Sequence, residues 1–404
     1  MKIKYLNVNF TNDIKLPDNI GEFNKYIFST IQKSSFLNII SDTNLLNDTV
    51  NTVDQYSKNK KRFVVFGTGG SNLGARALIN ILNIKTDIQI DFFDNIDPIF
   101  FEKSFTDIDI KTTGFIIISK SGTTPETLSQ IGTVVQISSN QNLLNEFYSN
   151  CLVITEFNSN PLYNIAIDNK CYLLEHKKDI GGRYSIFSNV ATVPAILAGL
   201  DIQAIHNGAK EVLNNINTID FLSLGQIFRY QSNTNYTSNV VMTYSDSLYF
   251  FGKWYLQLWA ESIGKEKKGI TPIHSIGTTD QHSQLQLYLD GPEDKFFTFI
   301  TTDHSNKGLK INNNIMQKEN VNYLINKKMG DLMQAEQKAT LSTFKNNLFK
   351  FREIYIPQIN EHSIGSLAAL SIIETIAACI YFEVNPFNQP SVEQGKSLTK
   401  KYLS

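Results

Sequence analysis

The sequence predicts an α/β protein with two doubly wound domains, each built on a parallel sheet, and with helical N- and C-terminal extensions. Short apolar runs alternate with helix-like stretches, a pattern typical of parallel strands that are covered on both faces. This alternation occurs in two separate blocks of the chain. A length of 404 residues allows two domains, and an apolar content of 42% supports a packed core.

The first block follows a polar segment with scattered aromatic residues, which we expect to form a few outer helices. RFVVF is a short apolar strand, GTGGSNLG is a glycine-rich turn, and the residues after it begin a helix. Further strands are expected in IQIDFFDNID, GFIIIS, CLVITE and CYLLEH. We therefore place a helical extension at residues 1–55 and the first α/β domain at 56–220.

The second block gives a second α/β domain at residues 221–385. Its strand-like segments are NVVMTYSD, KFFTFITTD and KFREIYIPQ, and a helix runs from the first of them to about residue 262. SIGSLAALSIIETIAACIYFEV is a long apolar helix. Residues 386–404 form a C-terminal segment and helix, with Ser391 as the predicted N-cap.

Charge and cysteine content limit the possible function classes. A net charge of -1 and a pI of about 6.6 provide no basic stripe for a phosphate backbone, so we expect no nucleic acid partner. Three cysteines without a CxxC motif favour a reducing compartment and no disulfide framework. The N-terminus lacks a signal peptide, and no apolar run approaches the roughly 18 residues of a membrane helix. We therefore expect a cytoplasmic protein without a membrane partner.

A cluster of hydroxyl side chains follows the strand that ends at Ile118. In ISKSGTTPETL, Thr124 and Pro125 read as the N-cap and first residue of a helix, whose free N–H groups favour a phosphate. We call residues 119–124 the hydroxyl loop. The predicted phosphate ligands in and beside it are Ser119, Ser121, Thr123, Thr124 and Thr127, and Lys120 is expected to contact the substrate. The alternative is an ordinary Ser/Thr-rich loop that caps a helix.

The glycine turn at residues 67–74 resembles a nucleotide loop only in part. A dinucleotide fingerprint would need glycine where Asn72 stands, and a Walker A loop would need lysine where Ala75 stands. Asp94 at the end of the next strand keeps dinucleotide binding as a weaker alternative. The favoured interpretation is a turn at which Gly70 and Ser71 approach a ligand closely.

Several motifs in a fixed order resemble the glucose-6-phosphate isomerase family. They are GTGGSNLG, ISKSGTTPET, GGRYS, AESIGK, GTTDQHSQ and NQPSVEQGK, and together they span roughly residues 66–400. The resemblance implies two sugar-isomerase (SIS) domains, no cofactor, and a homodimer whose active sites are built from both chains. It implies reversible isomerisation of glucose 6-phosphate to fructose 6-phosphate through a cis-enediol. The chain is shorter than most members, and Ile263 stands where the family often has asparagine.

The resemblance also assigns roles to single residues. Glu261 would be the base that moves a proton between C2 and C1, and Gln257 lies one helical turn before it. Arg183 would face the developing enediolate oxygen. His282 and Lys396 would assist ring opening, and Gln389 would contact the sugar. On the residues alone, each of these side chains could equally be structural or solvated.

Two other functions stay open on the sequence. A non-catalytic phosphosugar sensor would need the hydroxyl loop, but it would have no use for Glu261, His282 and Lys396 together. A dual glucose and mannose phosphate isomerase would differ only in pocket shape around C2. No metal motif occurs, and convergence of His274, His282 and His304 on a metal is a weaker alternative.

Overall fold

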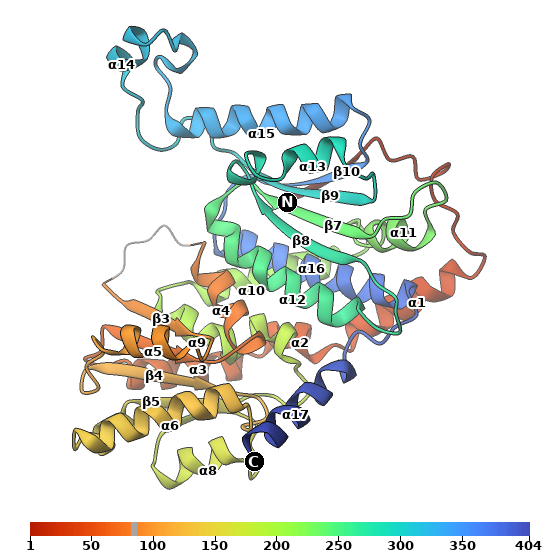
Figure 1. Cartoon of the computed structure of the whole chain (residues 1–404). Coiled ribbons are helices and arrows are strands. Elements are labelled where there is room, and N and C mark those ends of the chain that lie inside the picture. Colours follow the sequence, from red (N-terminus) through yellow and green to blue (C-terminus); the bar gives the residue numbers. More distant parts are fainter. Residues whose placement is uncertain (82–86) are drawn as a thin grey trace.

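The computed structural model describes residues 1–81 and 87–404. Within them lie two five-stranded sheets, with helices between the sheets and on their outer faces (Figure 1). The predicted α/β class with two α/β blocks is confirmed.

The first sheet contains β2 (Arg62–Phe66), β3 (Gln89–Phe93), β4 (Thr113–Ile118), β5 (Cys151–Thr155) and β6 (Tyr172–Glu175). Its order is β3-β2-β4-β5-β6, and all neighbours are parallel. The chain passes from β2 to β3 and then returns to β4 on the other side of β2. Strand order therefore reverses between β2 and β4, the position at which doubly wound sheets bind ligands.

Both faces of the first sheet are covered by helices. One face packs against α5 (Pro98–Phe105), α6 (Pro125–Asn140), α7 (Leu144–Ser149) and α8 (Pro161–Asp168), and the other packs against α3 (Thr43–Tyr56) and α9 (Asn189–Leu197). Val64 and Phe66 of β2 point to the first of these faces, and Phe63 and Val65 point to the second. Burial of both faces explains why these strands appear as continuous apolar runs.

The second sheet differs from the prediction at both edges. It contains β1 (Lys2–Leu6), β7 (Ser238–Thr243), β8 (Thr271–Ile276), β9 (Lys295–Thr302) and β10 (Phe351–Ile356), in the order β1-β10-β9-β7-β8. β1 pairs with β10 in antiparallel orientation, so the sheet is mixed and the N-terminal extension is not wholly helical. The sequence pattern missed β1 because its alternating lysines resemble a polar segment. It missed β8 because Pro272 and His274 interrupt the apolar pattern.

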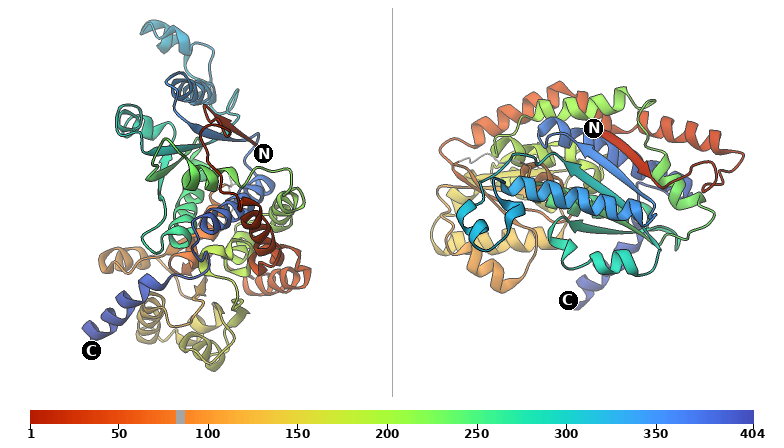
Figure 2. Two further views of the ribbon diagram at one scale, coloured as in Figure 1. Left: turned by 90° about the vertical axis from the view of Figure 1, so that its right-hand side faces the viewer. Right: turned by 90° about the horizontal axis from the view of Figure 1, so that it is seen from above.

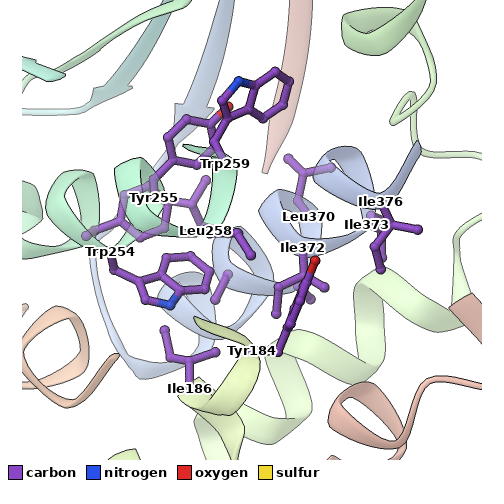
Figure 3. Close-up of a cluster of buried hydrophobic side chains, with 14 of the residues drawn as sticks. Tyr184, Ile186, Trp254, Tyr255, Leu258, Trp259, Leu370, Ile372, Ile373 and Ile376 are labelled. Carbon is purple, nitrogen blue, oxygen red and sulfur yellow. The ribbon is translucent and has the colours of Figure 1, made fainter. Parts of the chain in front are cut away.

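The space between the sheets is filled by helices around α16 (Glu361–Tyr381). This helix packs against α1 (Ile20–Gln32), α10 (Ile202–Asn214), α11 (Ser223–Tyr230) and α12 (Tyr249–Ile263). Figure 3 shows Leu370, Ile372 and Ile373 of α16 in the same cluster as Trp254 and Leu258 of α12. α16 is the one helix among the described residues that is long and apolar enough to cross a membrane, although 94% of its apolar window is buried inside the structure.

The remaining helices lie at the periphery or next to the candidate site. α13 (Leu285–Asp290) and α15 (Met329–Asn346) cover the outer face of the second sheet, and α14 (Asn313–Lys318) projects from it (Figure 1). α2 (Ser35–Asn38) follows α1, and α4 (Gly70–Ile79) packs between α9 and α12.

The C-terminal helix, α17 (Glu393–Leu403), extends away from the rest of the protein (Figure 2, left). None of its residues is buried. Ser391 is not its N-cap, because residues Pro390–Val392 form a short 3-10 turn and Val392 takes the N-cap position. Pro390 restricts the backbone there, so the chain enters α17 through a tighter turn than predicted.

Candidate active site

The candidate site lies where strand order reverses in the first sheet. The glycine turn follows β2 and the hydroxyl loop follows β4, so the two loops are neighbours at the carboxyl ends of adjacent strands. A Cβ placed on Gly67 would lie 3.3 Å from the carbonyl oxygen of Ile118, which shows how close the strand ends are. This arrangement matches the expected location of a ligand in a doubly wound domain.

The glycine turn brings three parts of the chain together. Gly69 has φ +56°, a conformation that favours glycine, and a Cβ there would lie 3.0 Å from Gln257 Nε2 on α12. A Cβ on Gly70 would lie only 2.2 Å from the carbonyl carbon of Gly182. Glycine at these two positions therefore permits the close contact that places the segment carrying Arg183 and the helix α12 beside the turn.

Arg183 lies at the centre of the site and is 3% exposed. Its Nη1 lies 3.3 Å from Glu261 Oε2 and donates to Gln389 Oε1 at 2.6 Å. Its Nε donates to Ser262 Oγ at 2.8 Å, and its Nη2 donates to the carbonyl oxygen of Pro386 at 2.6 Å. One guanidinium thus joins the segment after β6 to α12 and to the C-terminal segment, in the forked geometry that suits arginine.

Glu261 is held from both sides at the end of α12. Gln257, one turn earlier, donates from Nε2 to Glu261 Oε1 at 2.9 Å, and Arg183 approaches the other carboxylate oxygen. The helix ends at Ile263, close to the predicted end near residue 262, with Gly264 as its C-cap. The carboxylate side chain is 30% exposed, so it is oriented by protein groups and still open to a ligand. The structure brings together Arg183, Gln257, Glu261 and Gln389.

The hydroxyl loop is ordered by its own side chains. Ser119 Oγ and Thr124 Oγ1 are 2.8 Å apart, and Thr123 Oγ1 donates to Ser121 Oγ at 3.0 Å. Thr124 takes the N-cap position and Pro125 is the first residue of α6, as predicted, but no side chain caps this helix. The N–H groups at the start of α6 are therefore free to donate to an anion.

Two further predicted ligands, Lys120 in this loop and Thr127 just after it, have different surroundings. Thr127 is buried, and its Oγ1 has no hydrogen-bond partner within the described residues. The Lys120 ammonium donates to the carbonyl oxygen of Lys178 at 2.6 Å and lies 3.8 Å from Glu156. Burial lowers the pKa of Lys120. Its side chain thus ties the loop to the segment before Arg183, and its contact with the substrate stays a prediction.

Asn160 supports the hydroxyl loop and was not recognised in the sequence. It is 6% exposed, it caps α8 through a bond from the Tyr163 N–H, and its Nδ2 donates to the carbonyl oxygen of Glu156 at 3.1 Å. Gly122 of the loop has φ +63°, and a Cβ there would lie 1.6 Å from Asn160 Oδ1. Backbone N–H groups of Glu156 and Leu162 in turn bind carbonyl oxygens of the loop. The NSNP sequence around Asn160 is a helix-start signal that could have indicated it.

We expect Asn160→Ala to weaken binding of phosphorylated ligands. Loss of the cap costs about 1 kcal/mol and frees the segment that holds the backbone of the hydroxyl loop. KM for a phosphosugar should rise several-fold while kcat changes little, measured by steady-state kinetics. Asn164→Ala on the exposed face of the same helix is the matched control and should have no effect. Equal KM values for both variants would show that Asn160 does not support the loop.

His282 and Lys396 are not part of this cluster. His282 is exposed at the end of the 3-10 turn Thr279–Gln281, next to β8. Lys396 lies on the exposed helix α17, where its ammonium pairs with Glu393 at 2.7 Å. In the part of the chain that the structure describes, neither side chain has a hydrogen bond to Glu261, Arg183 or Gln389. Their assistance in ring opening stays a prediction.

The side chains that could have bound a dinucleotide or a metal ion have other partners in the structure. The carboxylate of Asp94 pairs with Arg76 at 2.9 Å. His274 Nε2 is 3.1 Å from Thr243 Oγ1, and the His304 ring contacts the carbonyl oxygen of Tyr244. Across residues 1–81 and 87–404, no group of three His, Cys, Asp or Glu side chains is arranged to hold a metal ion.

A buried histidine next to the site makes stability depend on pH. His176 is 1% exposed at the end of β6, and burial lowers its pKa from 6.5 to about 4. The unfolded chain binds this proton more tightly than the folded protein does. The contribution of neutral His176 to the free energy of unfolding is therefore complete above about pH 6.5 and is lost as pH falls towards 4. This shift corresponds to about 3 kcal/mol. In urea titrations across this range, His176→Gln should lose less stability than the parent protein, whereas His282→Gln at an exposed position should lose as much.

The sequence matches proteins of one known family over most of its length. A family model described as phosphoglucose isomerase matches residues 48–404. The glucose-6-phosphate isomerase of Methanocaldococcus jannaschii is 33% identical over 371 residues, which cover 90% of this chain and 88% of that protein. The glucose-6-phosphate isomerase of Rubrobacter xylanophilus is 31% identical over 352 residues, which cover 83% and 81%.

The fold agrees with these matches. The crystal structure of a hypothetical protein from Thermus thermophilus superposes with a TM-score of 0.86 at 26% identity, covering 95% of this chain and 94% of that one. The resemblance seen in the motifs is therefore confirmed along most of the sequence. The chain belongs to the phosphoglucose isomerase family.

Proposed function

We propose that this enzyme interconverts glucose 6-phosphate and fructose 6-phosphate, as a cytoplasmic step of glycolysis and gluconeogenesis. The observation that carries the proposal is the position of Glu261, held between Gln257 and Arg183 beside the glycine turn and the hydroxyl loop. A phosphosugar held by its phosphate at the start of α6 would extend its carbon chain towards this carboxylate. Such an isomerisation needs a phosphate-binding site at one end of the substrate and a carboxylate base next to the carbon atoms that react.

The proton transfer can be assigned to this chain's own residues. The Glu261 carboxylate removes the proton from C2 of the open-chain aldose. The C–H electron pair forms the C1–C2 double bond while the π pair of the C1 carbonyl moves onto O1, which gives a cis-enediolate and, on protonation, the cis-enediol. The same carboxyl group then returns the proton to C1 while the hydroxyl proton of O2 passes to O1 and the C2 carbonyl forms, which completes the ketose. The Arg183 guanidinium stabilises the negative charge that develops on the enediolate oxygens, and its burial strengthens that interaction. Gln257 and Gln389 orient the two charged groups.

Ring opening needs a further acid and base, which we assign to His282 and Lys396. Both lie outside the cluster in a single chain. We propose that the protein forms a homodimer in which the exposed His282 of one copy completes the active site of the other. The exposed helix α17 would bring Lys396 to the sugar by docking over the site.

A subunit mixture tests this shared site. Glu261→Gln and His282→Ala proteins should each be almost inactive. When the two are co-expressed with different affinity tags, the purified mixed dimer should regain about half of the parent activity. One of its two sites would combine an intact Glu261 with an intact His282 from the other chain. An inactive mixed dimer would place His282 and Glu261 of one site in the same chain.

The direct test is a coupled assay with fructose 6-phosphate, in which glucose 6-phosphate formation is measured with and without EDTA. Turnover that survives EDTA supports the proposed route. No turnover together with tight phosphosugar binding would indicate a non-catalytic sensor. Turnover of mannose 6-phosphate in a parallel assay would indicate the dual isomerase. Equal binding of glucose and glucose 6-phosphate would contradict phosphate binding at the hydroxyl loop.

A further inference from the structure

Two cysteines lie side by side at the edge of the first sheet opposite the candidate site. Cys151 is the first residue of β5, and Cys171 immediately precedes β6. β5 and β6 are parallel, with Leu152 opposite Tyr172, so the two cysteines occupy the preceding opposed positions. Residues opposed in a parallel pair point to the same face, and both cysteines pack in the apolar cluster that contains Val153 and Leu173.

The backbone geometry is compatible with a bond between them. Neighbouring strands lie about 4.8 Å apart, which is inside the range of Cα separations, roughly 4.4–6.8 Å, that disulfides span. The two thiols are close enough for each to shift the pKa of the other. Both are reduced in the structure. Closing a disulfide therefore requires rotation of two side chains and no rearrangement of the sheet.

The two sulfurs differ in a way that separates their roles. Cys151 is 1% exposed, its Sγ donates to the carbonyl oxygen of Phe147 at 3.2 Å, and burial raises its pKa. Cys171 is only partly buried, and the adjacent Cys151 side chain lowers its pKa. The thiolate is the reactive form of cysteine, so Cys171 is the accessible nucleophile and Cys151 is the thiol held next to it.

We propose that Cys171 and Cys151 form a peroxide-reactive pair that closes to an intramolecular disulfide. The Cys171 thiolate attacks the O–O bond of a hydroperoxide, which yields a sulfenic acid and releases the alcohol or, from hydrogen peroxide, water. The Cys151 thiol then attacks the sulfenic sulfur of Cys171, and the hydroxyl group of the sulfenic acid leaves as water with the proton of the thiol. Two thiols lose two electrons in total, and one hydroperoxide accepts them.

The third cysteine provides an internal control. Cys379 is fully buried in α16, and burial raises its pKa to about 12. It should keep its thiol while the pair reacts. The pair lies at the amino-terminal ends of β5 and β6, whereas the candidate active site lies at the carboxyl ends of the strands. Disulfide formation should therefore lower the number of free thiols and leave turnover unchanged.

The experiment treats the folded protein with hydrogen peroxide, quenches it, and counts free thiols after denaturation. We expect the count to fall from three to one, and non-reducing peptide mapping to show residues 151 and 171 linked. In Cys171→Ser, Cys151 should stay reduced. In Cys151→Ser, a dimedone adduct should accumulate on Cys171, because no second thiol resolves the sulfenic acid.

Other results would contradict the pairing. Three free thiols after peroxide treatment of the parent protein would show that Cys171 is not reactive. A dimedone adduct on Cys171 in the parent, without the linked peptide, would show that Cys151 does not resolve it. Loss of the Cys379 thiol at the same rate would show that peroxide acts on an unfolded fraction. Peptide mapping of the parent protein decides the question even if a serine variant folds poorly.

Discussion

Glu261→Gln should reduce kcat by about 10²–10⁴-fold, the usual contribution of a positioned general base. Glutamine keeps the shape of the side chain and can still accept a hydrogen bond from Arg183 or Gln257. It cannot take a proton from C2. KM and the affinity for a phosphosugar should therefore change little, since the substitution does not alter the hydroxyl loop. Steady-state kinetics and calorimetric binding measure the two quantities separately.

The control for this prediction is Glu266→Gln, a few residues past the end of α12. Glu266 is exposed and pairs with Lys268 at 3.4 Å. Its replacement removes the same charge from the same region and should leave kcat unchanged. Unchanged turnover in Glu261→Gln would refute its role as the base. An equal loss in both variants would instead indicate a general effect of charge near the helix end.

Glu374→Ala should destabilise the protein by about 3–5 kcal/mol. Glu374 in α16 and Arg352 in β10 are each 1% exposed, and Arg352 Nη2 donates to Glu374 Oε2 at 3.0 Å. Arg352 Nε also donates to Thr298 Oγ1 on β9 at 2.9 Å. Removing the carboxylate leaves a guanidinium buried without its counter-charge.

Urea denaturation with circular dichroism measures this loss. Glu319→Ala is a suitable control, because Glu319 pairs with Lys318 at 3.7 Å on the surface and both side chains are mostly exposed. Its free energy of unfolding should stay within about 1 kcal/mol of the parent value. A similar small change in Glu374→Ala would mean that Arg352 finds other partners or water in the core.

The sequence predicted those parts of the site that depend on local signals. The hydroxyl loop was located from the end of an apolar strand and the Thr-Pro helix start, and α6 begins at Pro125 as expected. Gln257 and Glu261 were placed on one helical face by their spacing, and the hydrogen bond between them confirms it. Strand ends, caps and helical spacing involve neighbouring residues, so one sequence is sufficient to recognise them.

Other features depend on contacts between distant parts of the chain. β1 is a strand because β10, about 350 residues later, offers it an edge. Asn160 matters because Gly122 of the hydroxyl loop packs against it, and no local pattern records that approach. The roles of His282 and Lys396 came only from family resemblance. The structure of a single chain leaves both side chains away from the base.

The position of α16 has a consequence for how the protein is made. This helix is the centre of the core, yet it occupies residues 361–381 of 404. During synthesis, the apolar faces of α10, α11 and α12 emerge long before the helix that covers them. The nascent chain therefore carries exposed apolar surface until it is almost complete, which favours assistance by chaperones and makes premature termination prone to aggregation.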